Sequence, residues 1–194
     1  IGVLTGGGDC PGLNAVIRGI VRKGVKEFGD EFVGFRDGWR GPLEDDTMPL
    51  GVDEVRGILP RGGTILGSSR GAQDPAVIVD RLTELSIDVL FVIGGDGSMR
   101  GAHRIVEEID RRGDRIAVVG VPKTIDNDIP HIGQSFGFST AFGRAAESIK
   151  AARVEVEAAI GGVGIVQVMG RHAGFIACYA ALANHDADFV LIPE

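Results

Sequence analysis

The sequence is poor in cysteine, in positive charge and in long hydrophobic runs, and each shortage narrows what the protein can be. Its 194 residues include two cysteines, Cys10 and Cys178, which form neither a metal-ligand spacing nor a disulfide pattern. Lys and Arg total 20 against 27 Asp and Glu, a net charge of −7. This balance argues against nucleic-acid or anionic-membrane partners and makes any phosphate site a local one. No apolar run is long enough to cross a bilayer and no signal peptide is visible, so a cytoplasmic protein is expected.

What the chain does have is a regular alternation of apolar runs and helical segments. The runs lack the polar–apolar alternation of half-exposed strands, as is typical of parallel strands covered on both faces. The order predicts an α/β fold: a doubly wound, mainly parallel sheet in a three-layer sandwich. The expected strands are residues 1–4, 32–35, 89–93, 116–121, 163–168 and 189–192, and the expected helices are residues 15–28, 75–85, 98–112, 140–159 and 175–183.

The two ends of the sequence influence the expected domain organisation. The chain starts inside one apolar run and stops directly after another. We therefore expect a fragment of a longer protein. A first lobe over residues 1–138 and the start of a second, similar lobe over residues 139–194 are predicted.

Residues 88–128 form the central unit, a strand–helix–strand segment with a polar cluster after each strand. The first cluster is Gly94-Gly95-Asp96-Gly97-Ser98 and the second is residues 122–128, PKTIDND. Ligands of such sheets bind at the carboxyl ends of the strands. Both clusters are therefore candidate binding loops.

The first cluster has the composition of a phosphate site. Its glycines allow backbone N–H groups to approach an oxygen-rich ligand, and the following helix N-terminus favours an anion. Ser98 is a candidate cap for that helix. Asp96 would repel phosphate unless it holds a cation, so Mg²⁺ is the predicted partner.

The second cluster has the composition of an acceptor site. Asp126 and Asp128 flank an amide, and Lys123 and Thr124 add a cation and a hydroxyl. A carboxylate beside a metal–phosphate site suits removal of a proton from an attacking hydroxyl. Aspartate-rich turns are also common caps, so plain turn chemistry is the alternative for either cluster taken alone.

Further loops at predicted strand ends carry candidate ligands. Residues 5–14 form a glycine-rich loop that lacks the Lys-Ser/Thr ending of a Walker A motif. Residues 61–71 combine glycines and hydroxyls with Arg70. Trp39, the only tryptophan, either stacks on a purine or packs in its loop. Arg171, expected directly after a strand, is placed to grip a phosphate, although a surface arginine is the simpler reading.

Taken together, these stretches resemble the phosphofructokinase family. The matching segments, in family order, are GGGDCPGLNAVIRG, RGGTILGSSR, IGGDGS, PKTIDNDI, FGFSTA and MGRHAGFIA. GGDG alone also resembles lipid and NAD kinases, whereas the ordered set is specific. The resemblance implies a glycolytic, Mg²⁺-dependent kinase that transfers phosphoryl to O1 of fructose 6-phosphate.

The resemblance also implies roles for individual residues. Asp126 is the implied catalytic base, and Lys123 is the second implied catalytic residue. The remaining implied ligands are, for the nucleotide, Gly8, Arg70, Gly71, Gly95, Asp96, Gly97 and Ser98, with Asp96 also on the metal, and, for the sugar phosphate, Thr124, Ile125, Asp126, Met169, Gly170 and Arg171.

Members of the family use either ATP or pyrophosphate as donor. In the pyrophosphate pattern an aspartate commonly stands at the Gly97 position, with lysine at the Lys123 position. Gly97 leaves space for the inner phosphate of a nucleotide, so ATP is expected and pyrophosphate is the alternative. A catalytically silent regulatory subunit of the same fold is an alternative of another class. The family also implies a homo-oligomer, a dimer or a tetramer.

Overall fold

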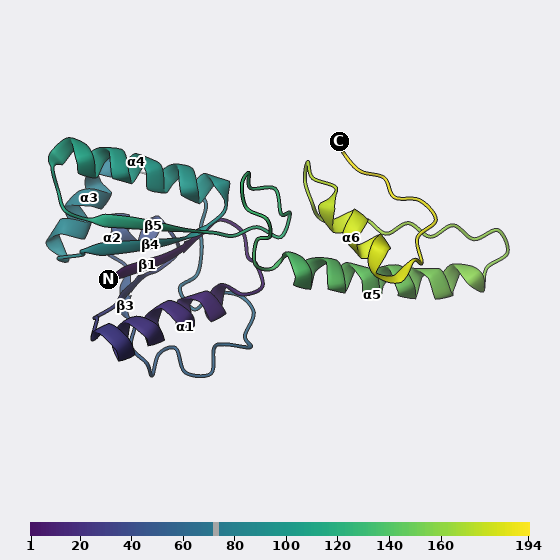
Figure 1. Cartoon of the computed structure of the whole chain (residues 1–194), viewed down its shortest axis with the longest axis horizontal. Helices are drawn as coiled ribbons and strands as arrows, with labels where there is room; N and C mark the ends of the chain where they lie inside the picture. Colours follow the sequence, from purple (N-terminus) through teal and green to yellow (C-terminus); the bar gives the residue numbers. More distant parts are fainter. Residues whose placement is uncertain (72–73) are drawn as a thin grey trace. The chain divides into compact units, whose positions relative to one another are not determined.

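The structure is a computed structural model that describes residues 1–71 and 74–194. It comprises two compact units, Ile1–Lys123 and Thr124–Glu194, which are described separately (Figure 1). The two lobes predicted from the sequence, residues 1–138 and 139–194, are divisions of the complete family fold and differ from these compact units, and that division stays a prediction. No helix in the described part of the chain is long and apolar enough to cross a membrane.

The first unit is built on a five-stranded sheet of order β3-β2-β1-β4-β5. All neighbouring strands are parallel except β3, which pairs antiparallel with β2. The neighbouring inner strands β1 and β4 carry apolar runs, because both faces of these strands are covered. The strands are β1 Gly2–Gly6, β2 Val33–Phe35, β3 Thr47–Pro49, β4 Val89–Gly94 and β5 Ala117–Pro122. The predicted mainly parallel sheet is confirmed, and β3, which the sequence analysis did not predict, adds its antiparallel edge.

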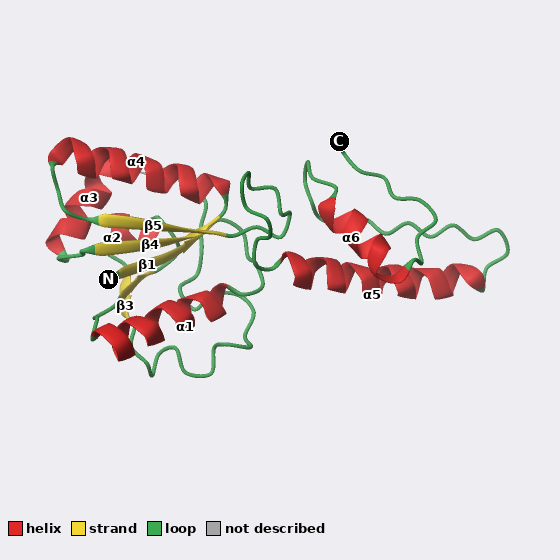
Figure 2. Cartoon of the chain, viewed as in Figure 1, coloured by secondary structure: helices red, strands yellow, loops and turns green. Residues whose placement is uncertain are grey.

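Helices cover both faces of this sheet (Figures 1 and 2). On one face, α1 (Leu13–Lys23) buries Leu13, Ile17 and Val21, which recur every four residues. It runs into a π-helical turn, Gly24–Phe28, that ends at Gly29 in the left-handed region. The other face carries α2 Arg40–Glu44, α3 Pro75–Glu84 and α4 Asp96–Arg112.

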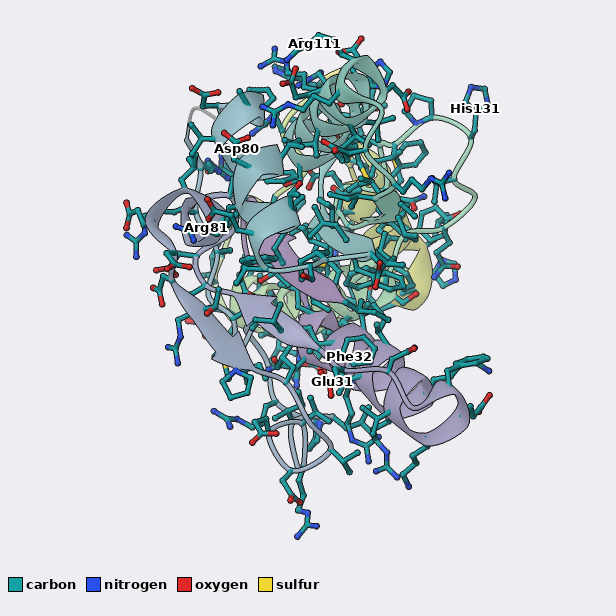
Figure 3. The ribbon with its side chains drawn as sticks, turned by 90° about the vertical axis from the view of Figure 1, so that its left-hand side faces the viewer. Glu31, Phe32, Asp80, Arg81, Arg111 and His131 are labelled. Carbon is teal, nitrogen blue, oxygen red and sulfur yellow. The ribbon has the colours of Figure 1, made fainter. Side chains whose placement is uncertain are left out.

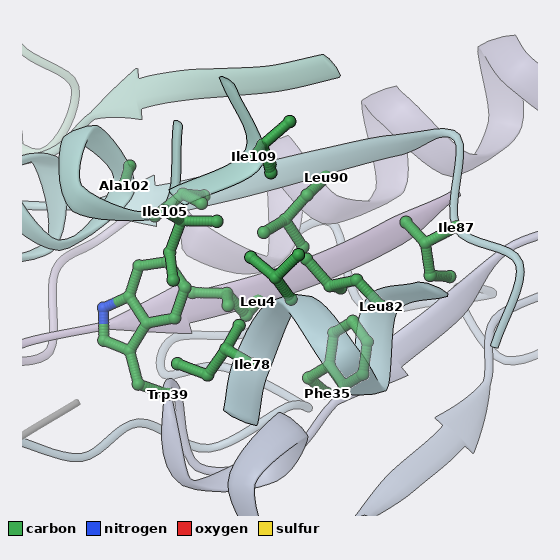
Figure 4. Packing of buried hydrophobic residues seen from close by; sticks show 12 residues of the cluster. Leu4, Phe35, Trp39, Ile78, Leu82, Ile87, Leu90, Ala102, Ile105 and Ile109 are labelled. Carbon is green, nitrogen blue, oxygen red and sulfur yellow. The ribbon is translucent and has the colours of Figure 1, made fainter. Parts of the chain in front are cut away.

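Trp39 lies inside the core between the sheet and α3 and α4 (Figure 4). Only 6% of its surface is exposed, and it belongs to the same buried cluster as Ile78 and Ile105. The packing alternative considered for this residue is therefore the one the structure shows. A ring this buried offers no face for a purine to stack on.

The second unit contains two helices, α5 (Phe138–Glu157) and α6 (Phe175–Asn184) (Figure 2). They meet through an aromatic group in which the Phe138 and Tyr179 rings are 5.0 Å apart. The predicted strands at 163–168 and 189–192 are wrong, because both segments are irregular. An apolar run forms a strand only when a neighbouring strand accepts its backbone hydrogen bonds, and the described residues of this unit contain no strand.

Candidate functional site

The glycine-rich loops of the first unit meet where the strand order reverses. The chain moves from β1 outward to β2 in one direction and later returns to place β4 on the other side of β1. Such switch points are where open α/β sheets bind ligands. Gly6 and Gly94 are register partners there, and Gly94 also pairs with Pro122 of β5. The loops predicted separately from sequence are thus brought together.

Two cations flank the loop that follows β1. The Lys123 side chain is only 5% exposed and its Nζ donates to the carbonyl of Gly8. Arg70 approaches the same residue: a Cβ atom built on Gly8 would lie 3.3 Å from its guanidinium. Two positive charges beside a glycine-rich loop are the arrangement expected of an anion site, and that assignment stays a prediction. Gly71 follows Arg70 and is exposed.

The first turn of α4 completes this edge. Gly95 is the N-cap, without a side-chain cap, so the predicted capping role of Ser98 is wrong. Ser98 is instead buried against the strand ends, because a Cβ on Gly6 would lie 2.5 Å from its Oγ. Asp96 and Gly97 occupy the first helical positions and are exposed. Their backbone N–H groups have no partner within the helix, which favours an anionic ligand.

Asp96 is the one carboxylate of this cluster that suits a metal. Its Oδ2 lies 2.5 Å from Arg100, an exposed ion pair within the first turn of α4. No group of three or more His, Cys, Asp or Glu side chains within residues 1–71 and 74–194 is placed to hold a metal. One exposed carboxylate suits Mg²⁺ only together with the phosphates of a substrate, which commonly complete the coordination of this ion. A magnesium site at Asp96 therefore stays a prediction.

Sequence reasoning missed the polar residues that hold the Arg70 loop. Thr5, at the end of β1, is fully buried and donates to the carbonyl of Gly67 over 2.6 Å. Asn14, in the first turn of α1, is 1% exposed; its Oδ1 accepts from the Ile65 amide at 2.8 Å. Both are hydrophilic residues at positions where the helix or strand pattern calls for burial, which is the signal that could have found them.

In the second unit, residues 124–128 form a turn stabilised by its own side chains. Thr124 Oγ1 accepts the backbone N–H of Asp126 at 3.0 Å. Asn127 adopts φ 54° and its Oδ1 accepts the N–H of Ser135 at 2.8 Å. The Ser135 hydroxyl donates to the Thr124 carbonyl. Asp126 is half-buried in this turn, so its carboxylate has a defined location, with Ile125 beside it in the chain.

Met169, Gly170 and Arg171 form a second turn of this unit, ahead of α6. Met169 is 72% exposed, and Arg171 has φ 53°. Gly170 has φ 147°, and its carbonyl accepts the Ala173 N–H at 2.8 Å. The expectation that Arg171 follows a strand end is therefore wrong. A sugar-phosphate site formed by these residues and the 124–128 turn stays a prediction.

Comparison with known proteins decides the family. The family model described as phosphofructokinase matches residues 1–194. The chain belongs to the phosphofructokinase family. The resemblance noted in the sequence is thereby confirmed.

The phosphofructokinase relatives divide by phosphoryl donor. A pyrophosphate–fructose 6-phosphate 1-phosphotransferase of Streptomyces coelicolor is 53% identical over the whole chain, which covers 56% of that protein. An ATP-dependent 6-phosphofructokinase of Amycolatopsis methanolica is 55% identical over the whole chain and 43% of its own length. The chain thus spans about half the length of these relatives.

Solved phosphofructokinase structures share the fold. The enzyme of Saccharomyces cerevisiae matches 99% of this chain and 29% of its own with a TM-score of 0.88 and 31% identity. A pyrophosphate-dependent phosphofructokinase from Marinobacter aquaeolei matches 94% of this chain and 49% of its own, with a TM-score of 0.84 and 28% identity.

Proposed function

We propose that the full-length protein is a 6-phosphofructokinase that transfers a phosphoryl group from ATP to O1 of fructose 6-phosphate. The observation that carries this proposal is the anion site at the strand switch point. There Lys123 and Arg70 flank the bare backbone of Gly8. Two cations beside a loop without side chains suit a polyphosphate rather than a neutral ligand. Family membership supplies the sugar-phosphate acceptor.

The donor side of the reaction would be held by residues of the first unit. Lys123, Arg70 and the Gly95–Ser98 loop bind the phosphate oxygens, and Gly71 borders the nucleotide. Asp96 would hold Mg²⁺, which, when bound, neutralises charge on the transferred phosphoryl group. Because the site is preformed backbone, little reorganisation is needed when the donor arrives.

The acceptor side would be held by residues of the second unit, on the strength of the resemblance. Asp126 accepts the proton of the O1 hydroxyl while the O1–phosphorus bond forms and the bond to the leaving ADP breaks. Thr124 and Ile125 line the transfer site. Met169, Gly170 and Arg171 bind the sugar phosphate, with the Arg171 guanidinium able to form a bidentate contact.

Gly97 favours ATP as the donor. A Cβ atom built there meets nothing within 4 Å, so the space beside the first turn of α4 is open for an inner phosphate of a nucleotide. Pyrophosphate is the second candidate, favoured by Lys123 and by the 53% identity to a pyrophosphate-dependent relative. A catalytically silent subunit is a candidate of another class, opposed by the intact site residues.

Donor kinetics on the full-length protein test the proposal. We expect fructose 1,6-bisphosphate to form with Mg²⁺ and ATP, and to form much more slowly with pyrophosphate. Faster turnover with pyrophosphate would transfer the assignment to the runner-up. No product with either donor would favour the silent subunit. Following the family, we also propose a cytoplasmic homo-oligomer, a dimer or a tetramer, which light scattering on the purified protein would measure.

A further inference from the structure

A buried hydroxyl near the end of β1 is hydrogen-bonded to the loop that carries Arg70. Thr5 Oγ1 donates to the Gly67 carbonyl over 2.6 Å and lies 2.9 Å from Thr64 Oγ1. Thr64 Oγ1 also accepts the Leu66 N–H at 3.1 Å. One strand side chain is therefore joined, directly or through one hydroxyl, to three residues of the loop.

The direction of each hydrogen bond in this series follows from which group carries a proton. A threonine hydroxyl has one proton, and the Gly67 carbonyl has none, so the Thr5 proton points to Gly67. Thr5 Oγ1 then accepts the Thr64 proton, and Thr64 accepts from the Leu66 amide. In this series of hydrogen bonds each hydroxyl donates its proton toward Gly67 and accepts from the group on its other side. Loss of the Thr5 hydroxyl would leave the Gly67 carbonyl without its donor and the Thr64 hydroxyl without its acceptor.

These hydrogen bonds also affect the position of Arg70. Beyond Gly67, the Ser69 carbonyl accepts the Gly7 N–H at 3.3 Å, which brings the loop against the glycine segment after β1. Arg70 follows directly, with its guanidinium 3.3 Å from where a Cβ of Gly8 would be. The end of β1 thus leads into the glycine segment Gly6–Gly8 and also holds the loop of residues 64–70. Both segments belong to the proposed site for the phosphoryl donor.

We infer that Thr5 is a positioning residue for the phosphoryl donor: its hydroxyl fixes residues 64–70 so that Arg70 stands beside Gly8. The inference rests on the proposed function for its kinetic consequences, but its structural part does not. A buried threonine that merely satisfies its own hydroxyl would affect stability alone. A positioning residue affects binding of the donor and leaves binding of the sugar phosphate unchanged.

The test compares Thr5→Val, which keeps the shape and removes the hydroxyl, with Thr5→Ser, which keeps the hydroxyl. In the full-length protein we expect Thr5→Val to raise the KM of the donor about tenfold, because a buried carbonyl loses its partner and the loop loosens. KM for fructose 6-phosphate should change less than about twofold. Thr5→Ser should restore the donor KM. Equal changes in both KM values, or no rescue by serine, would overturn the inference.

Thr83→Val is the control for loss of a threonine hydroxyl away from this loop; Thr83 is exposed, whereas Thr5 is buried. This variant also removes a hydroxyl that donates to a carbonyl, Val79, at 2.9 Å, but from within α3. The donor KM should not change in this variant. If Thr5→Val does not fold, Thr64→Val breaks the same chain one hydroxyl away and should raise the donor KM by a smaller factor; an unchanged value would count against the inference.

Hydrogen–deuterium exchange on the ligand-free protein separates this inference from the proposed function. Thr5→Val should speed exchange of the amides in residues 64–70, whereas Thr5→Ser and Thr83→Val should not. Unchanged exchange in Thr5→Val would refute the positioning role whatever the activity. If the wild type is inactive, the proposed function fails, and calorimetric Kd values for Mg-ATP and Mg-pyrophosphate take the place of KM in the same comparison.

Discussion

Single residues at the strand ends determine how closely a ligand can approach the first unit. A Cβ on Gly6 would lie 2.5 Å from Ser98 Oγ, and one on Gly94 would also collide with the Ser98 side chain. These strand ends must therefore stay without side chains. Gly97 differs, because a Cβ there meets nothing within 4 Å. A substitution at Gly97 consequently tests ligand binding without disturbing the packing.

Gly97→Asp is expected to reduce ATP-dependent activity by roughly 10²-fold, because a like charge beside phosphate oxygens costs several kcal/mol. Its melting temperature should stay close to that of the wild type, given the open space. Steady-state kinetics with ATP and with pyrophosphate measure the effect. Gly19→Asp is the control, since it also adds a carboxylate to an exposed helical glycine with open space. Full ATP activity in Gly97→Asp would refute the role of charge at this position.

Asp126→Asn is expected to lower kcat by about 10²–10⁴-fold, the usual contribution of a general base. The amide is nearly isosteric, so the turn that holds Thr124 and Ser135 should persist and both KM values should change little. Asp128→Asn, in the same turn, is the comparison: Asp128 accepts a hydrogen bond from Thr124 at 3.3 Å, and a smaller loss is expected. Near-normal kcat in Asp126→Asn would remove it from the base role.

At the scale of elements, an ionic network joins α3 to α4. Arg112 of α4 bonds Asp80 of α3 at 2.5 Å, the Ala76 carbonyl at 3.0 Å and Glu108 of its own helix at 2.6 Å. Arg111 adds two further bonds to Glu108. Asp80 and Arg111 are labelled in Figure 3. The hydrogen bonds from Arg111 and Arg112 lower the pKa of Glu108 to about 2.

This pKa predicts how the network responds to acid. A carboxyl whose pKa is lowered in the folded state stabilises the fold at pH values above its ordinary pKa of 4.5. This contribution is lost as the pH falls toward the folded-state pKa of about 2. Glu108→Gln should therefore lower the free energy of unfolding at pH 7, and its deficit relative to the wild type should shrink below pH 4.5. Urea unfolding across this pH range measures both. Glu107→Gln, whose exposed side chain faces His103, should show no comparable deficit; a deficit independent of pH in Glu108→Gln would contradict the ionic explanation.

At the scale of the whole molecule, the two units differ in how much apolar surface they bury. The first unit has a continuous cluster of buried residues from its strands and helices. In the second unit the 20-residue helix α5 buries only Phe138, and α6 buries Ile176 and Ala180. Ile165, Phe189 and Leu191 are each at least 88% exposed. Burial is the main favourable term in folding, so the units should differ in intrinsic stability.

Residues 1–123 produced alone are expected to unfold in a cooperative thermal transition, because their core lies within that segment. Residues 124–194 produced alone should show none and should bind a hydrophobic dye. Calorimetry and dye fluorescence on the two segments measure this. A sharp transition in the second segment would show that its stability does not depend on the burial seen here.

The strands that could be predicted from sequence are those with a clear apolar run, whereas strands that depend on pairing with a distant segment could not be predicted. β1, β4 and β5 were predicted to within about two residues, because each is an apolar run that ends in a glycine-rich or polar cluster. β3 was missed: its sequence, Thr47–Pro49, is three residues long and owes its conformation to pairing with β2. The runs at 163–168 and 189–192 had the composition of strands but remain irregular, since pairing is not a property of a run by itself.

The family resemblance and the types of group in the candidate site could be read from the sequence, because the spacing of glycines, carboxylates and cations is a local property of the chain. The sequence analysis predicted Asp96 and Arg70 as ligands and Lys123 as a catalytic residue, without showing that Lys123 and Arg70 converge on Gly8. Three features became visible only once the chain was folded: that convergence, the burial of Trp39 in the core, and the hydrogen bonds from Thr5 to the Arg70 loop. Each depends on residues about 30 to 115 positions apart in the chain, whose contacts are set by strand order and packing rather than by local sequence.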